Sequence, residues 1–137
     1  MKAFASTFIA TLLAVLIGGG ALMSWQQYDA RKQAEHDLAV DNLAKYIETT
    51  SSSIVSYSSY VFDDSRQAKA QELSDSLQKS EERAEQLRQN QRTTPVDSQR
   101  LRNALRKLKS AREELAERKV QHAKWKAERE KTGTGQP

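Results

Sequence analysis

The chain has 137 residues, a formal net charge of +4 and no cysteine. This length fits a single domain, and the absence of cysteine excludes disulfides and thiolate chemistry. Large apolar side chains are sparse after Met23, so a compact globular domain of this size could not fill its core, whereas helices that bury one narrow stripe need far fewer of them.

The first element is an uncharged run over residues 3–28. A run of this length can cross a bilayer core of about 30 Å as a helix. Signal peptides have shorter apolar cores and a small-x-small cleavage site. The boundary after Met23 offers no good site of this kind, and Trp25 and Tyr28 fit an interfacial belt. We therefore predict an uncleaved transmembrane signal anchor over residues 3–25, with cleavage near Ala21 as the alternative.

Small side chains recur at every fourth position of this run and predict a face on which two membrane helices pack closely. They are Ser6, Ala10, Ala14 and Gly18. Residues 1–2 are then a short cytoplasmic tail, and such a short tail favours a cytoplasmic N-terminus with the rest of the chain outside.

Residues 26–92 are predicted to form an extracytoplasmic helical, coiled-coil segment, because apolar residues recur there at alternating three- and four-residue spacings. The first seam continues through Thr50, Ile54, Tyr57 and Val61. Residues 49–60, rich in Ser and Thr, are its weakest part and could be a hinge or a strand-like patch, although we favour a continuous helix. The seam positions in this segment are Val40, Leu43, Ile47, Leu73, Leu77 and Leu87.

Residues 93–131 are predicted to form a separate, basic distal helix. Thr94 suits the capping position, Pro95 the first helical turn and Asp97 the unpaired N–H groups behind it, so Thr94 and Pro95 mark a hinge. This helix either folds back on the preceding segment or extends the rod, and residues 132–137 form a flexible tail. Its apolar face carries Leu101, Leu105, Leu108 and Leu115.

Charge is distributed unevenly along the chain. Residues 33–94 hold 7 Lys/Arg against 11 Asp/Glu, and residues 95–137 hold 12 against 6. The distal helix should therefore contact an anionic partner or a membrane surface, since a Trp among cations suits both. Interspersed glutamates make nucleic acid an unexpected partner. The candidate contact residues are Arg118, Lys119, Lys124, Trp125 and Lys126.

Enzyme chemistry finds no support in the sequence. His36 and His122 lie far apart among charged residues, and no third ligand is spaced for a metal, so we interpret both as solvated side chains of polar helix faces. No phosphate-binding glycine loop or nucleophile–base motif is present. We predict a protein that is not an enzyme and has no cofactor, no metal site and no catalytic residues.

The sequence thus predicts an all-α chain with a single N-terminal transmembrane helix followed by an elongated coiled-coil or helical-hairpin rod. In this organisation it resembles the bacteriophage inner-membrane spanins, the Rz-like lysis proteins. The matching features are the anchor at residues 3–23, the heptad stretches, the break around Pro95 and the basic distal end. Spanins often carry cysteines for covalent dimerisation, so a dimer of this chain would be non-covalent.

The resemblance implies a single-pass protein of the host inner membrane, with its rod in the periplasm. Its partners would be a second copy and an outer-membrane lipoprotein, and its function would be to link inner and outer membranes in the final, membrane-disrupting step of host lysis (cytolysis). One alternative is a bitopic coiled-coil scaffold subunit of a bacterial division or secretion complex. Another is an exported helical protein of a conjugative secretion apparatus, which requires a cleaved signal.

Overall fold

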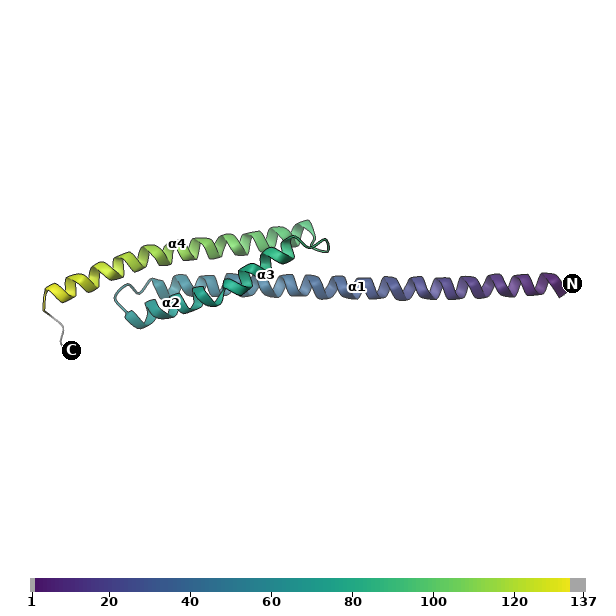
Figure 1. The fold of residues 1–137 in the computed structure, drawn as a ribbon, viewed down its shortest axis with the longest axis horizontal. Helices are drawn as coiled ribbons and strands as arrows, with labels where there is room; N and C mark the ends of the chain where they lie inside the picture. The colour runs from purple at the N-terminus through teal and green to yellow at the C-terminus, as the bar shows by residue number, and fades with distance from the viewer. Residues whose placement is uncertain (1, 134–137) are drawn as a thin grey trace. The chain divides into compact units, whose positions relative to one another are not determined.

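The computed structural model describes the backbone of residues 2–133 and the side chains of residues 23–133. Within this part of the chain every regular element is a helix, so the predicted all-α class is confirmed (Figure 1). The chain forms two compact units, Met1–His36 and Asp37–Pro137. The helices are α1 (Lys2–Ser58), α2 (Asp64–Ser76), α3 (Gln78–Arg88) and α4 (Pro95–Lys131).

The predicted transmembrane helix and the single-pass inner-membrane location require correction. Among the residues that the structure describes, no helix is both long and apolar enough to cross a membrane. From Met23 onward α1 soon becomes highly charged, and each such side chain is costly in hydrocarbon. The charges in this stretch are Asp29, Arg31, Lys32, Glu35 and Asp37. The side chains of the predicted packing face (Ser6, Ala10, Ala14 and Gly18) lie outside the described residues, as does most of the predicted span.

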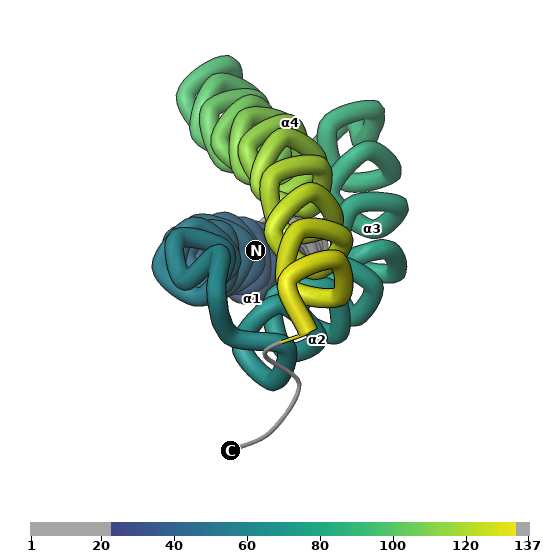
Figure 2. Tube along the Cα trace, turned by 90° about the vertical axis from the view of Figure 1, so that its left-hand side faces the viewer, coloured from purple at the N-terminus to yellow at the C-terminus, as the bar shows by residue number. Residues whose placement is uncertain are grey.

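The unit Asp37–Pro137 is a three-helix bundle made of the last part of α1, the α2–α3 pair and α4 (Figures 1 and 2). Along the bundle the last part of α1, the α2–α3 pair and α4 alternate in direction (Figure 1). Ion pairs connect neighbouring segments: the Arg100 guanidinium of α4 lies 2.7 Å from the Asp41 carboxylate of α1. The distal helix therefore folds back, which is one of the two arrangements that the sequence left open.

The core alternates large and small side chains at heptad spacing. In α1 the large residues Val40, Ile47 and Ile54 are fully buried, and each is followed by a small residue that is at most 1% exposed: Ala44, Ser51 and Ser58. In α4 Leu101, Leu108 and Leu115 alternate with Ala104 and Ala111. Small side chains let helices approach closely, so this narrow core is filled with few leucines.

In each repeat, one residue that was predicted to lie in the seam is not fully buried in the core. Leu43, Leu73 and Leu105 lie at its edge and are only partly buried. Tyr57, predicted to continue the first seam, is 38% exposed, and its place is taken by Ser58. The remaining predicted seam residues are buried: Val40, Ile47, Leu77, Leu87, Leu101, Leu108 and Leu115.

The serine-rich stretch of residues 49–60 is helical only as far as Ser58. The chain then turns at residues 59–63 before α2 begins, so the favoured continuous helix is wrong and the alternative of a break here is correct. The buried hydroxyl groups of this stretch donate to carbonyls of the preceding turn, from Ser51 to Ile47 at 2.6 Å and from Ser58 to Val55 at 3.0 Å. Such bonds satisfy hydroxyls that would otherwise be buried without partners. They explain how polar side chains can lie in the core of the bundle.

α2 and α3 are separated at Leu77, where the backbone N–H donates to the Ser74 carbonyl three residues back. Arg112 of α4 contacts this break: its Nη1 lies 2.6 Å from Glu81 Oε2, its Nε 3.3 Å from Ser74 Oγ and its Nη2 3.4 Å from the Ser74 carbonyl. The guanidinium thus connects α4 to both halves of the bent segment.

The turn between α3 and α4 is closed by side chains. The Thr93 hydroxyl donates to the Leu87 carbonyl at the end of α3. Thr94 caps α4, as predicted: its Oγ1 accepts from the Asp97 N–H at 3.1 Å, and Pro95 occupies the first turn. These contacts satisfy groups that have no partner within the helices, and so stabilise the reversal of the chain.

Candidate functional site

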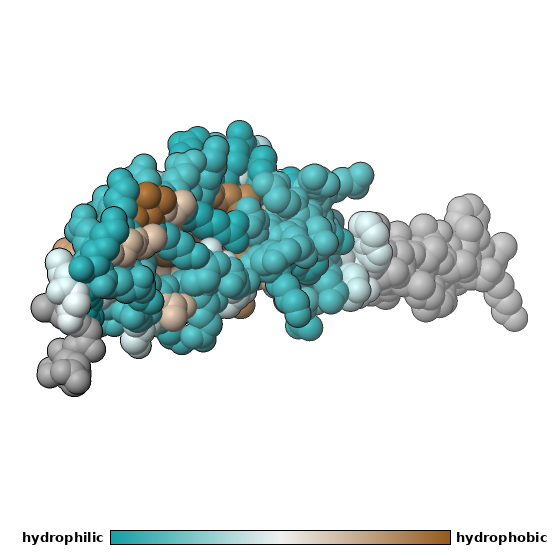
Figure 3. All heavy atoms as spheres, turned by 60° about the vertical axis from the view of Figure 1, so that its left-hand side comes forward, coloured by the Kyte–Doolittle hydropathy of each residue, from teal (hydrophilic) through white to brown (hydrophobic). Residues whose placement is uncertain are grey.

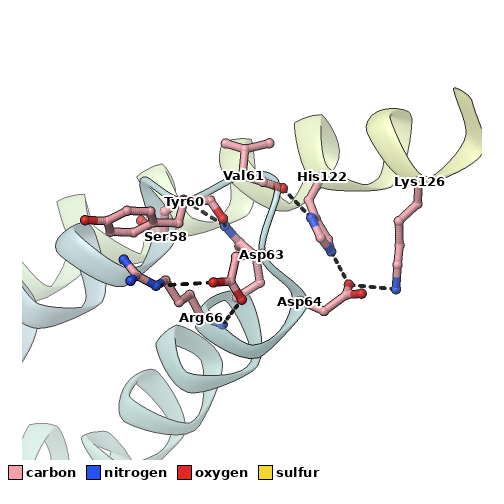
Figure 4. A network of polar contacts seen from close by, with 9 residues as sticks. Ser58, Tyr60, Val61, Asp63, Asp64, Arg66, His122 and Lys126 are labelled. Atoms are coloured by element: carbon pink, nitrogen blue, oxygen red, sulfur yellow. Dashed lines mark hydrogen bonds and ion pairs between the residues drawn. The ribbon is translucent and has the colours of Figure 1, made fainter. Parts of the chain in front are cut away.

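The candidate site is the end of the bundle where the α1–α2 turn meets the last turns of α4 (Figure 4). We call this region, residues 59–66 and 118–130, the tip. It contains the five contact residues predicted from the sequence. On the face drawn in Figure 3 the described surface is mostly hydrophilic and carries a few small apolar patches.

His122 connects α4 to the turn. Its side chain is 13% exposed, its Nδ1 contacts the Val61 carbonyl, and its Nε2 lies 2.7 Å from Asp64 Oδ1. Both ring nitrogens of His122 thus meet acceptor groups of the α1–α2 turn and the start of α2. The interpretation of His122 as a solvated side chain is therefore wrong, because residues distant in sequence cover it.

Asp64 receives a second cation from α4. Lys126 Nζ lies 2.8 Å from the same Oδ1 that His122 contacts. The hydrogen bond from Lys126, followed by that from His122, holds the pKa of the Asp64 carboxyl below its ordinary value of 3.8. Asp64 thus joins two positions of α4, one helical turn apart, to the first residue of α2.

An aromatic cluster lies beside this network. The Trp125 ring meets the Phe62 ring edge to face, with 5.7 Å between centroids, and lies 5.4 Å from the His122 ring. The Arg129 guanidinium is 5.4 Å from the Trp125 ring centre, within the range of a cation–π contact. Phe62 remains 72% exposed, so the cluster presents an apolar surface to solvent.

The turn itself is held by α2. Asp63 caps α2 by accepting from the Arg66 N–H at 3.1 Å, and the Arg66 guanidinium lies over the Tyr60 ring at 3.6 Å. The buried Gln67 amide donates to the Ser58 and Tyr60 carbonyls, at 2.8 and 3.2 Å. These bonds occupy carbonyls at the end of α1 that have no helical partner.

The predicted contact residues have different surroundings in the structure. Lys126 and Trp125 belong to the network and the cluster described above. Lys119 donates to Gln71 of α2, and Arg118 lies 3.7 Å from Glu114 within α4. Lys124 lines a hollow beside Phe62. Their contact with a partner stays a prediction.

Sequence reasoning missed Phe62, Asp64 and His122. The hydrophobic and charge patterns of the sequence do not indicate a contact between Asp64 and His122, because the two residues are 58 positions apart and meet only once α4 folds back. Within the described residues, no group of three or more His, Cys, Asp and Glu side chains could hold a metal ion.

Comparison of the chain with protein-family models, curated proteins and solved structures finds no match. The function therefore has to be inferred from the residues and the fold.

Proposed function

We propose that this chain is a non-enzymatic tether of the spanin type, whose helical bundle binds a partner lipoprotein and contributes to the membrane-disrupting last step of phage-induced host lysis. The proposal concerns the bundle and its partner, and it includes no membrane-crossing helix of this chain.

One observation carries the proposal. The fold-back places the basic end of α4 on the α1–α2 turn, where an exposed Phe62 and a half-buried Trp125 lie among cations. Rigid aromatic side chains beside cations are typical of protein-binding surfaces. A narrow bundle with such a surface at one end is suited to binding a partner and to transmitting force.

A second copy of the chain remains a proposed partner. The apolar seams predicted for the dimer are buried within the bundle, Val40, Ile47 and Leu101 among them. A dimer must therefore use exposed residues or exchange helices between two chains.

The test is a lysis assay in magnesium-stabilised cells. After lysis is induced, cells lacking the gene should remain as unburst spheres, and the wild-type gene supplied in trans should restore bursting. Trp125→Ala should restore it in less than about half of the cells, because truncation of a central aromatic residue of a protein interface commonly costs more than about 1 kcal/mol.

Val96→Ala is the matched control, since Val96 is 77% exposed on the first turn of α4, remote from the tip. It should restore bursting fully. Normal bursting without the gene would exclude the spanin-type function and favour a scaffold of a division or secretion complex.

A further inference from the structure

A groove of about 450 Å³ runs along α4 beside the α1–α2 turn. Val61 and Phe62 lie on one wall, and Arg118, Lys124 and Trp125 lie on the other. We call it the tip groove. Its volume falls within the range of about 300–1,000 Å³ in which proteins bind small ligands and short peptide segments.

Contacts of Phe62 and of its two chain neighbours position the apolar part of the groove. Phe62 lies between Val61, whose carbonyl contacts His122, and Asp63, which caps α2. Its ring packs edge to face on Trp125, yet 72% of the residue stays exposed. A preformed apolar surface loses little conformational entropy on binding, so it favours a ligand with an apolar side chain.

The charged part of the groove is mainly positive. Arg118 and Lys124 line it, together with a single acidic residue, Glu128. Among the described residues Lys124 makes no ion pair, and Arg118 makes two long contacts within α4, at 3.7 Å to Glu114 and at 3.4 Å to the Gln121 side-chain oxygen. Carboxylates of a ligand would therefore find two cations available, and charge-assisted hydrogen bonds are the stronger kind.

We propose that the tip groove binds a short acidic segment of a partner protein, with one apolar side chain against Phe62 and Trp125 and flanking carboxylates at Arg118 and Lys124. The inference rests on the proposed function for the existence of a partner protein, and adds the chemistry that the partner must present.

The experiment uses the full chain with Trp25→Phe, which leaves Trp125 as the only tryptophan of the two. The probe is a capped five-residue peptide with a central leucine flanked by aspartates. Its addition should change Trp125 fluorescence saturably, with a Kd between about 10 μM and 1 mM, as for a small interface. The same peptide with lysines in place of the aspartates, or glycine in place of the leucine, should bind at least about tenfold more weakly.

Two variants of the groove test the assignment, and each should weaken binding about five- to tenfold: Phe62→Ala, for the apolar contact, and Lys124→Glu, for the charge. Lys109→Glu is the matched control, because Lys109 lies on α4 outside the groove, 3.9 Å from Glu113. It should leave the Kd unchanged, and circular dichroism should show the same helix content for all three.

Equal binding of the three peptides would overturn the proposal, and so would equal losses in Lys124→Glu and Lys109→Glu, which would indicate general charge attraction. Binding to vesicles of anionic phospholipid that depends on Phe62, with no peptide binding, would assign the groove to a membrane surface and also overturn it. Peptide binding together with normal lysis in cells lacking the gene would leave the groove assignment intact while the proposed function fails.

Discussion

At the residue scale, the tip depends on two side chains that belong to different helices. Asp64 begins α2 and His122 lies near the end of α4, and their contact, with that of Lys126, joins the α1–α2 turn to the distal helix. The residues next to Asp64 and His122 in the sequence do not indicate that these two side chains will meet. A sequence pattern reports which face of its own helix a residue occupies, and it carries no information on which turn will cover that face.

Asp64→Asn should lower the melting temperature of the protein at pH 7, because the amide loses the charge that Lys126 and His122 stabilise. The folded-state pKa of Asp64 is lowered, so its contribution is present above the ordinary value of about 3.8 and is lost as the pH falls through the folded pKa. The difference in melting temperature between wild type and variant should therefore vanish under strongly acidic conditions, as thermal circular dichroism between pH 7 and pH 2 would measure.

Asp75→Asn serves as the control for that series. Asp75 is exposed and accepts one hydrogen bond, from Gln71 at 2.6 Å, which an asparagine oxygen can also accept. It should leave the melting temperature nearly unchanged. A difference for Asp64→Asn that grows as the pH is lowered would contradict the electrostatic explanation.

At the element scale, the heptad patterns predicted that both segments are helical, but they missed the turn at residues 59–63 and assigned some core positions incorrectly. The α1 seam was predicted through Leu43 and Tyr57, whereas the small residues Ala44 and Ser58 enter the core. At the position between them both the predicted Thr50 and its neighbour Ser51 are buried. A hydrophobic pattern favours a tyrosine over a serine at a core position, but helices that approach closely have room only for a small side chain there. The start of α4 was predictable because Thr94, Pro95 and Asp97 act locally.

Adjacent serines allow the size requirement to be tested. Ser51 is fully buried, and Ser52 beside it is exposed, although both hydroxyls donate to the helix backbone. Ser51→Leu should destabilise the protein by about 1–3 kcal/mol, since the larger side chain must displace the facing helices.

Ser52→Leu should change the free energy of unfolding by no more than about 0.5 kcal/mol, as for most surface substitutions. Urea unfolding followed by circular dichroism measures both. Equal effects of the two substitutions, or stabilisation by Ser51→Leu, would show that this face of α1 does not pack as described.

At the scale of the whole molecule, the sequence predicted an all-helical chain but could not choose between an extended rod and a hairpin. That choice depends on contacts between distant segments, such as Arg100 with Asp41 and Arg112 with Glu81. Surface ion pairs of this kind contribute little individually, so the buried alternation of large and small side chains must supply most of the stability of the bundle.

The predicted membrane anchor shows a different limit of prediction from sequence. A long uncharged run identifies a hydrophobic helix, yet the described part of α1 is charged and no described helix is suited to crossing a membrane. The proposed function accordingly depends on the bundle and its tip.

The measurement that tests the folded-back bundle most directly is an intramolecular cross-link. The chain has no cysteine, so the double variant Asp64→Cys/Lys126→Cys carries the only two thiols. Their native side chains meet at 2.8 Å, whereas one continuous helix would separate the two positions by about 90 Å at helical rise. A short bismaleimide should therefore link them within one chain at dilute protein concentration.

The control pair is Asp64→Cys/Arg102→Cys. Position 102 lies about 36 Å along α4 from position 126 at helical rise, so this pair should not be linked within one chain. A cross-linked species of monomer mass for the first pair and none for the second is the predicted result. Cross-linked dimers only, or no cross-link in the first pair, would contradict the folded-back bundle and the tip that depends on it.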